Sequence, residues 1–322
     1  MDTDPDMMAL RRSPEAEGVP GRRNFFRALG LATALGGGLS LIGGNQLAEA
    51  QTAAPTDADV LNFALNLEYL ESNFYSIAVL GEQLPAELRT GTGTPGAVSG
   101  GRQVTFTDAV LGQMAREITL NERTHVAFLR NQLGTAAIAQ PAIDLSVSPT
   151  SAFSLAARSA GLIGEGESFD PYLNEENFLL AAFLFEDVGV TAYKGAAPLL
   201  TNKTFIDASA GILAVEAYHS AILRASIHMK GMATPAVFDR SEAISNARDT
   251  LDGAPDLDQG VRPSGSGDTL TSNIAPLDAN GLAFSRTTGQ VLNIAYLTRT
   301  STDRGGFFPN GVNGNIRVSA AS

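Results

Sequence analysis

Apolar residues recur every three or four positions in four segments of the chain, a spacing typical of helices that bury one face. Asp57 or Asp59 can cap the first segment, Thr107 the second and Asn174 the third. The pattern predicts an all-α protein built on a four-helix bundle. The predicted helices span residues 57–80, 107–133, 174–197 and 203–230.

Charged residues interrupt the apolar stripes of the second and fourth helices in the same way. The stretches NERTHVAFLR and VEAYHSAILR share the pattern E-x-x-H-x-A-x-L-R. Glu122 and His125 occupy it in the first stretch, and Glu216 and His219 occupy it in the second. The chain has three histidines, and two of them fall at this motif position. The repetition indicates two halves of one site.

The first and third helices carry a matching feature. Glu68 and Glu186 interrupt their stripes, and each is followed seven residues later by a tyrosine, Tyr75 or Tyr193. Seven residues make about two helical turns, so each glutamate and its tyrosine share a face. The order along the chain is therefore Glu, Glu-x-x-His, Glu, Glu-x-x-His. We interpret the two tyrosines as core aromatics, with a catalytic role beside the site as the alternative.

Four glutamates on buried stripes require compensating positive charge, because burying one carboxylate costs several kcal/mol. Two divalent ions would balance the four carboxylates, and neutral imidazoles leave that balance unchanged. A Glu and a His three residues apart point to the same side of a helix and can bind one ion together. We therefore predict a site for two divalent metal ions. Glu71 is a rival to Glu68 as the ligand from the first helix.

Two regions lie outside the helical pattern. Residues 81–102 include TGTGTPGAVSGG and are predicted to form a long loop inserted after the first helix. Gly134 and Gly231 are predicted to end the second and fourth helices. Residues 51–231 would form the bundle, with a short helix near 150–162. Residues 232–322 would form a C-terminal extension, mostly loop with a short helix capped by Thr287 or Thr288, packed on the bundle.

Composition limits which metal ligands and which partners the chain can have. The chain has 322 residues, no cysteine and a net charge of −12. The absence of cysteine leaves Glu, Asp and His as the metal ligands. The acidic balance argues against nucleic acid as a partner, since phosphate binding requires clustered Lys and Arg.

The first 50 residues have the order of regions found in a secretory signal: a charged region, then an apolar region, then small residues. Arg22 and Arg23 precede a glycine-rich apolar run, and AEA at residues 48–50 is a cleavage motif. The segment resembles a twin-arginine signal, which implies the twin-arginine export machinery as a partner and a periplasmic or extracellular location. The run is a poor membrane anchor because of its glycines and marginal length.

The stretches DVLNFALNLEYLESNFY, AREITLNERTHVAFLR and AAFLFEDVGVTAYKGAAP resemble the ferritin-like superfamily, and in particular its desiccation-related proteins. The resemblance covers about residues 57–231 and implies a bundle that holds two Fe or Mn ions. Asn121 departs from the family, in which Asp is common at that position. Which carboxylates bridge the ions stays open. The implied ligands are Glu68, Glu122, His125, Glu186, Glu216 and His219.

Three functions are compatible with such a site. The first is an exported di-iron or di-manganese protein that oxidises Fe(II) or detoxifies peroxide in envelope stress. The second is a non-enzymatic desiccation or stress protein with a structural or vestigial metal site. The third is iron storage in a cage of many subunits, and a smaller homo-oligomer is also considered.

Overall fold

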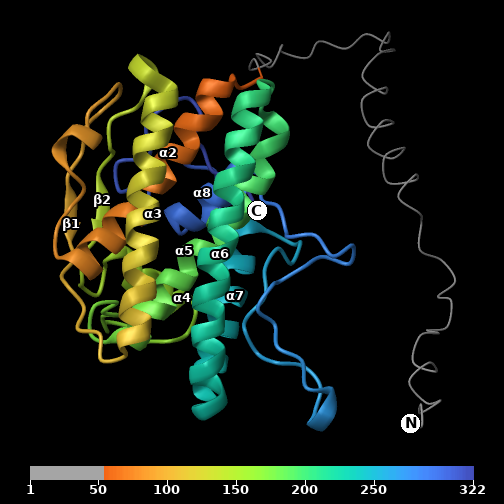
Figure 1. Ribbon diagram of the computed structural model, residues 1–322. Coiled ribbons are helices and arrows are strands. Elements are labelled where there is room, and N and C mark those ends of the chain that lie inside the picture. The colour runs from red at the N-terminus through yellow and green to blue at the C-terminus, as the bar shows by residue number, and fades with distance from the viewer. Residues whose placement is uncertain (1–53) are drawn as a thin grey trace, which may run out of the picture. The chain divides into compact units, whose positions relative to one another are not determined.

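Four long helices form the centre of the computed structural model, which describes residues 54–322 (Figure 1). They are α2 (Asp57–Tyr75), α3 (Ala109–Leu133), α5 (Glu175–Ala196) and α6 (Lys203–Ala233). The predicted all-α bundle is thus confirmed. The shorter helices are α4 (Ala152–Ser159), α7 (Ala236–Asp252), α8 (Thr288–Tyr296), a π-helix η2 (Ser76–Leu80) and the 3₁₀ turns η3 (Ala86–Leu88), η4 (Gly134–Ala136), η5 (Ala197–Leu199) and η6 (Gly267–Thr269). The predicted signal segment, residues 1–50, lies outside the described residues.

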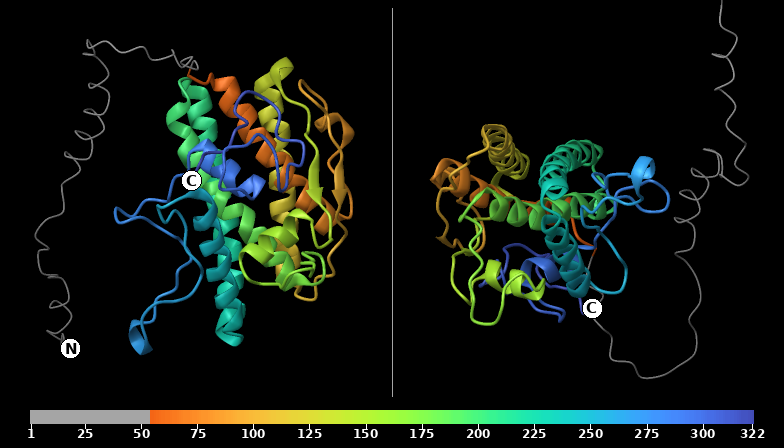
Figure 2. Two further views of the ribbon diagram at one scale, coloured as in Figure 1. Left: turned by 180° about the vertical axis from the view of Figure 1, so that it is seen from behind. Right: turned by 90° about the horizontal axis from the view of Figure 1, so that it is seen from below.

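Hydrogen bonds at the two ends of the bundle fix the helix directions. Glu175, at the start of α5, accepts from the backbone N–H groups of Thr107 and Asp108 and forms an ion pair with Lys230 near the end of α6. At the opposite end, Asp57 accepts from the backbone of Thr201 and Asn202. Helices α3 and α5 therefore run parallel, and the segment between them crosses the length of the bundle (Figure 2).

The N-terminal caps differ in detail from the predictions. Thr56, rather than Asp57 or Asp59, caps α2, because its hydroxyl accepts from Asp59 N while the Asp59 carboxylate accepts from Thr56 N. Asp108, rather than Thr107, caps α3. Asn174 caps α5 as predicted. The observed caps of α2 and α3 lie next to the predicted residues Asp57 and Thr107, and the cap of α5 is the predicted residue.

The glycine-rich insertion packs against the crossover segment that follows α3. Strand β1 (Val98–Gly100) pairs in parallel with β2 (Ile143–Leu145), a small sheet that the sequence pattern did not predict. A Cβ atom at Gly96 would lie 2.0 Å from the Ala142 backbone nitrogen. Close backbone packing therefore explains a glycine at this position.

The fourth helix and the extension differ most from prediction. Helix α6 does not end at Gly231 but continues to Ala233. Close packing explains the glycine, because a Cβ atom there would lie 2.5 Å from the ring of Phe238. Helix α7 occupies residues predicted to be loop. Its buried face contains Ser241, Ser245 and Arg248 alongside apolar residues, so the apolar stripe that would have marked it is incomplete. Helix α8 begins after Thr287, as predicted.

A buried network of three arginines and three aspartates joins the extension to the bundle. Arg224 of α6 and Arg248 of α7 both contact Asp187 Oδ2 of α5, at 2.7 and 3.2 Å. Arg286, just before α8, contacts Asp252 and Asp258, both at 2.6 Å. All six side chains are at most 2% exposed. Three positive and three negative charges balance one another, and this balance allows the network to be buried.

Within residues 54–322, no helix combines the length and the apolar character needed to cross a membrane.

Replacing Arg286 tests whether this network holds the extension. In Arg286→Leu, Asp252 and Asp258 lose a cationic partner, so the free energy of unfolding should fall by about 3–5 kcal/mol. Denaturant unfolding measures the loss. Arg304→Leu is the matched control, because Arg304 pairs with Asp303 at the surface and should contribute about 1 kcal/mol or less. Equal losses in the two variants would contradict a specific role for the network.

Candidate metal centre

The six residues singled out by the sequence meet at the middle of the bundle. Glu68 comes from α2, Glu122 and His125 from α3, Glu186 from α5, and Glu216 and His219 from α6. The four glutamates are fully buried, and His125, at 7% exposure, is the most accessible of the six. Within residues 54–322, the salt bridges of these glutamates are to His125 and His219, and none is to Lys or Arg.

The cluster divides into two groups that share two carboxylates. One group contains Glu68, Glu122, His125 and Glu216, and the other contains Glu122, Glu186, Glu216 and His219. Within each group the potential ligand atoms lie within 4.8 Å of one another. Glu122 and Glu216 belong to both groups, so these two side chains are placed to bridge a pair of ions. Glu68 with His125, and Glu186 with His219, would each complete one side.

Interatomic distances within the groups match those between ligands of one ion. His125 Nδ1 lies 3.4 Å from Glu68 Oε2 and 3.3 Å from Glu216 Oε1. His219 Nδ1 lies 2.9 Å from Glu122 Oε1 and 3.5 Å from Glu186 Oε2. Ligands held at about 2.1 Å from a metal are separated from each other by about 3–3.5 Å.

The hydrogen-bonding pattern supports a cation at this position. Buried polar atoms without a hydrogen-bond partner are uncommon in proteins. Here they include both carboxylate oxygens of Glu122, Glu186 and Glu216, together with Glu68 Oε2 and Nδ1 of both histidines. All of these atoms belong to residues of the two groups. Their oxygen and nitrogen ligands suit Fe, Mn or Zn. The residues therefore fit a pair of divalent ions.

Burial and mutual repulsion shift the acid–base equilibria of the cluster. Burial, followed by the charges of Glu216 and Glu68, raises the pKa of Glu122 well above its ordinary range. Burial and the charge of Glu186 raise the pKa of Glu216 to about 8. Burial lowers the pKa of His125, but the carboxylates of Glu68 and Glu216 outweigh that effect and raise it to about 10. Without bound cations, the cluster holds protons in their place.

Neighbouring side chains orient the cluster. The Tyr193 hydroxyl donates a hydrogen bond to Glu68 Oε1, which leaves Oε2 directed at His125. Asn121 Nδ2 lies 3.2 Å from His219 Nε2. If the amide is flipped so that its oxygen faces the ring, Asn121 accepts from Nε2–H and leaves Nδ1 free to bind an ion. In that orientation Asn121 would orient His219.

The remaining candidates lie beside the cluster. Glu71 is 5% exposed and belongs to neither group, so of the two carboxylates considered in the first helix Glu68 is the one that lies in the cluster. Burial, and then the charges of Glu216 and Glu186, raise the pKa of Glu71 well above its ordinary range. The Tyr75 hydroxyl is buried without a hydrogen-bond partner, and burial and the charge of Glu186 raise its pKa.

Sequence reasoning missed Gly189, which lies in the middle of α5. A Cβ atom there would lie 2.6 Å from Glu216 Oε2 and 3.4 Å from Glu71 Oε1. A glycine inside a helix costs about 1 kcal/mol relative to alanine, so its presence there is a signal that something passes close by. In this protein the close neighbours are the carboxylates of the centre.

Comparisons with known proteins agree with the geometry. The chain is 28% identical over 271 residues to the ferritin-like catalase Nec2 of Nesocodon mauritianus. This alignment covers 81% of this chain and 84% of the relative. It is 31% identical over 270 residues to the desiccation-related protein PCC13-62 of Craterostigma plantagineum, which covers 80% and 83%. The family described as "Ferritin-like domain" matches residues 56–229, the four helices that supply the six clustered side chains. The protein therefore belongs to the ferritin-like domain family.

Proposed function

We propose that the protein binds two Fe or Mn ions and disproportionates hydrogen peroxide. Two groups of buried ligands that share Glu122 and Glu216 are the observation that carries this proposal. The reaction converts two molecules of hydrogen peroxide into two of water and one of dioxygen. A bound pair of redox-active ions would supply the two-electron exchange between the two peroxide molecules. The similarity to a relative named ferritin-like catalase supports this reaction over others.

The protein's own residues would bind the ions, exclude water and manage protons. The four buried glutamates offset the charge of two divalent ions. Tyr193 and Asn121 orient Glu68 and His219 through hydrogen bonds. Glu71 is a buried carboxyl beside Glu216 that is not needed as a ligand. Its oxygen can hold a proton that passes from the oxidised to the reduced peroxide.

A second function has its own support. The relative from Craterostigma plantagineum is named a desiccation-related protein, without reference to an activity. A stress protein with a structural metal site would retain the metal and lack turnover. Oxidation of Fe(II) is a further reaction that the same ligands could support. Assays with each substrate separate these alternatives.

Removing the two shared carboxylates tests the metal site. Purified protein from cells supplied with Fe and Mn should contain about two ions per chain, and Glu122→Gln/Glu216→Gln should contain almost none. Metal should raise the melting temperature of the wild type and leave that of the double variant unchanged, since a ligand stabilises the state that binds it. Elemental analysis and calorimetry measure both effects. Glu117→Gln is the control, because Glu117 is exposed on the same helix. Metal-free wild-type protein would refute the site.

Peroxide turnover tests the reaction. Metal-loaded protein should release one dioxygen for two peroxides consumed, measured with an oxygen electrode. Tyr193→Phe removes the hydrogen bond to Glu68 and should lower activity or metal affinity about 10- to 100-fold. Tyr218→Phe, at an exposed position of α6, should behave as the wild type. If protein with two ions per chain turns over neither peroxide nor Fe(II), the non-enzymatic function is favoured.

We also propose export by the twin-arginine pathway, on the evidence of the N-terminal sequence. The exported product should begin at Gln51, as determined by N-terminal sequencing. Replacing Arg22 and Arg23 with lysine should retain the precursor in the cytoplasm. The same exchange at Arg11 and Arg12, which do not lie directly before the apolar run, is the control. Equal export of both variants would argue against this pathway.

A further inference from the structure

A small apolar cavity lies between the bundle and the C-terminal extension. Leu67 of α2 and Val188 of α5 line its bundle side, and Val291 and Ala295 of α8 line the opposite side together with Phe307. Its volume is about 30 Å³, which is enough for one or two molecules of the size of water. Glu71 is the one charged side chain among the lining residues.

The cavity ends next to the candidate metal centre. Gly189 also lines it, and the point where a Gly189 Cβ would lie is 2.6 Å from Glu216 Oε2 and 3.4 Å from Glu71 Oε1. The Glu216 carboxylate therefore packs directly against the Gly189 backbone, and Glu71 itself lines the cavity. Any larger residue at position 189 would press on Glu216.

The lining selects for a small apolar molecule. Water and hydrogen peroxide would lose hydrogen bonds on entering a space bounded by Leu, Val and Phe side chains, whereas an apolar molecule loses none. Of the molecules in the proposed reaction, dioxygen is the apolar one. One peroxide is oxidised to dioxygen and gives up two electrons and two protons, and the second peroxide takes up both to form two waters.

We propose that this cavity receives the dioxygen released at the centre, an inference that rests on the proposed peroxide reaction. Gly189 lets the Glu216 carboxylate lie close to this end of the cavity, and the extension provides the apolar wall through Val291, Ala295 and Phe307. The polar substrate then approaches from another side, and product and substrate do not compete for one path.

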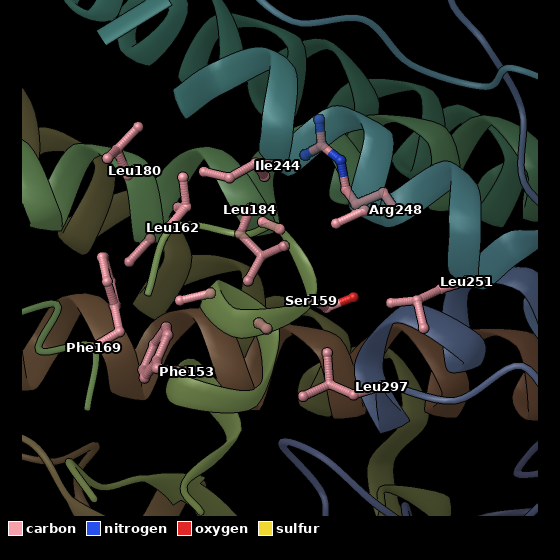
Figure 3. Close-up of a pocket in the computed structure, with 15 residues that line it drawn as sticks. Phe153, Ser159, Leu162, Phe169, Leu180, Leu184, Ile244, Arg248, Leu251 and Leu297 are labelled. Carbon is pink, nitrogen blue, oxygen red and sulfur yellow. The ribbon is translucent and has the colours of Figure 1, made fainter. Parts of the chain in front are cut away.

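A second apolar cavity offers an internal control. It is lined by Phe153, Leu180, Leu184, Ile244 and Leu251, around which Figure 3 shows the apolar side chains gathered. Its volume is also about 30 Å³, but neither Glu71 nor Gly189 lines it. Ala157 lines this cavity and not the first, and Ala295 lines the first and not this one.

Xenon is the probe, because it occupies apolar cavities and can be located by its anomalous scattering. Crystals of the full chain under xenon pressure, with and without metal, should show xenon beside Val291 and Phe307. Ala295→Leu should abolish this peak, and Ala157→Leu should leave it unchanged. Ala295→Val is a smaller substitution for use if the leucine variant does not fold. Absence of xenon from this cavity in the wild type would overturn the proposal.

Kinetics then connect the cavity to the reaction. In Ala295→Leu, kcat for peroxide should fall while the metal content and the KM for peroxide stay at wild-type values, since peroxide enters elsewhere. Ala157→Leu should retain the wild-type kcat. An unchanged kcat in Ala295→Leu, with an active wild type, refutes the dioxygen path and leaves the proposed function intact. An inactive metal-loaded wild type refutes the proposed function itself, whatever xenon shows.

Discussion

Uncompensated negative charge at the centre of the bundle is the constraint on which the rest of the structure depends. Glu68, Glu122, Glu186 and Glu216 are buried, and their ionic contacts within residues 54–322 are to two histidines. Burial of that charge is tolerated in one of two ways: protons neutralise it, or cations do. The raised pKa values of Glu122 and Glu216 describe the first state, and the arrangement into two groups that share ligands suits the second.

Helix α5 links this centre to a second buried polar system of opposite character. Glu186 faces the carboxylate cluster, and the next residue, Asp187, faces Arg224 and Arg248. Consecutive residues on a helix point about 100° apart, so one helix can serve both systems. The arginine–aspartate network balances its own charge, whereas the glutamate cluster does not. A polar network whose charges balance without a ligand can hold α5 in place, while the unbalanced glutamate cluster remains available to bind ions.

The sequence predicted the six clustered residues because each interrupts a stripe that is otherwise apolar, as Glu122 and His125 do in α3. The same reasoning failed for α7, whose buried face contains Arg248 and Asp252 and therefore lacks a clear stripe. That Glu122 and Glu216 belong to both groups could not be predicted, because it depends on how far the α3 side chains reach toward α6 in the folded bundle. Gly189 carried a signal, a glycine within a helix, but its meaning depends on carboxylates from α2 and α6 that fold against it.

The C-terminal extension gives the centre two sides of different polarity. On the α3 side, His125 is the most exposed of the six residues and Asn121 is partly exposed, so polar groups border the centre on this side. On the opposite side, α8 and Phe307 cover Glu71 and Gly189 with apolar surface. Four helices alone would leave that second side open to water, which would solvate Glu71 and Glu216 and weaken their interaction with bound ions. The extension therefore does more than lengthen the bundle: by closing this side it maintains the low polarity in which the buried carboxylates require protons or cations to neutralise them.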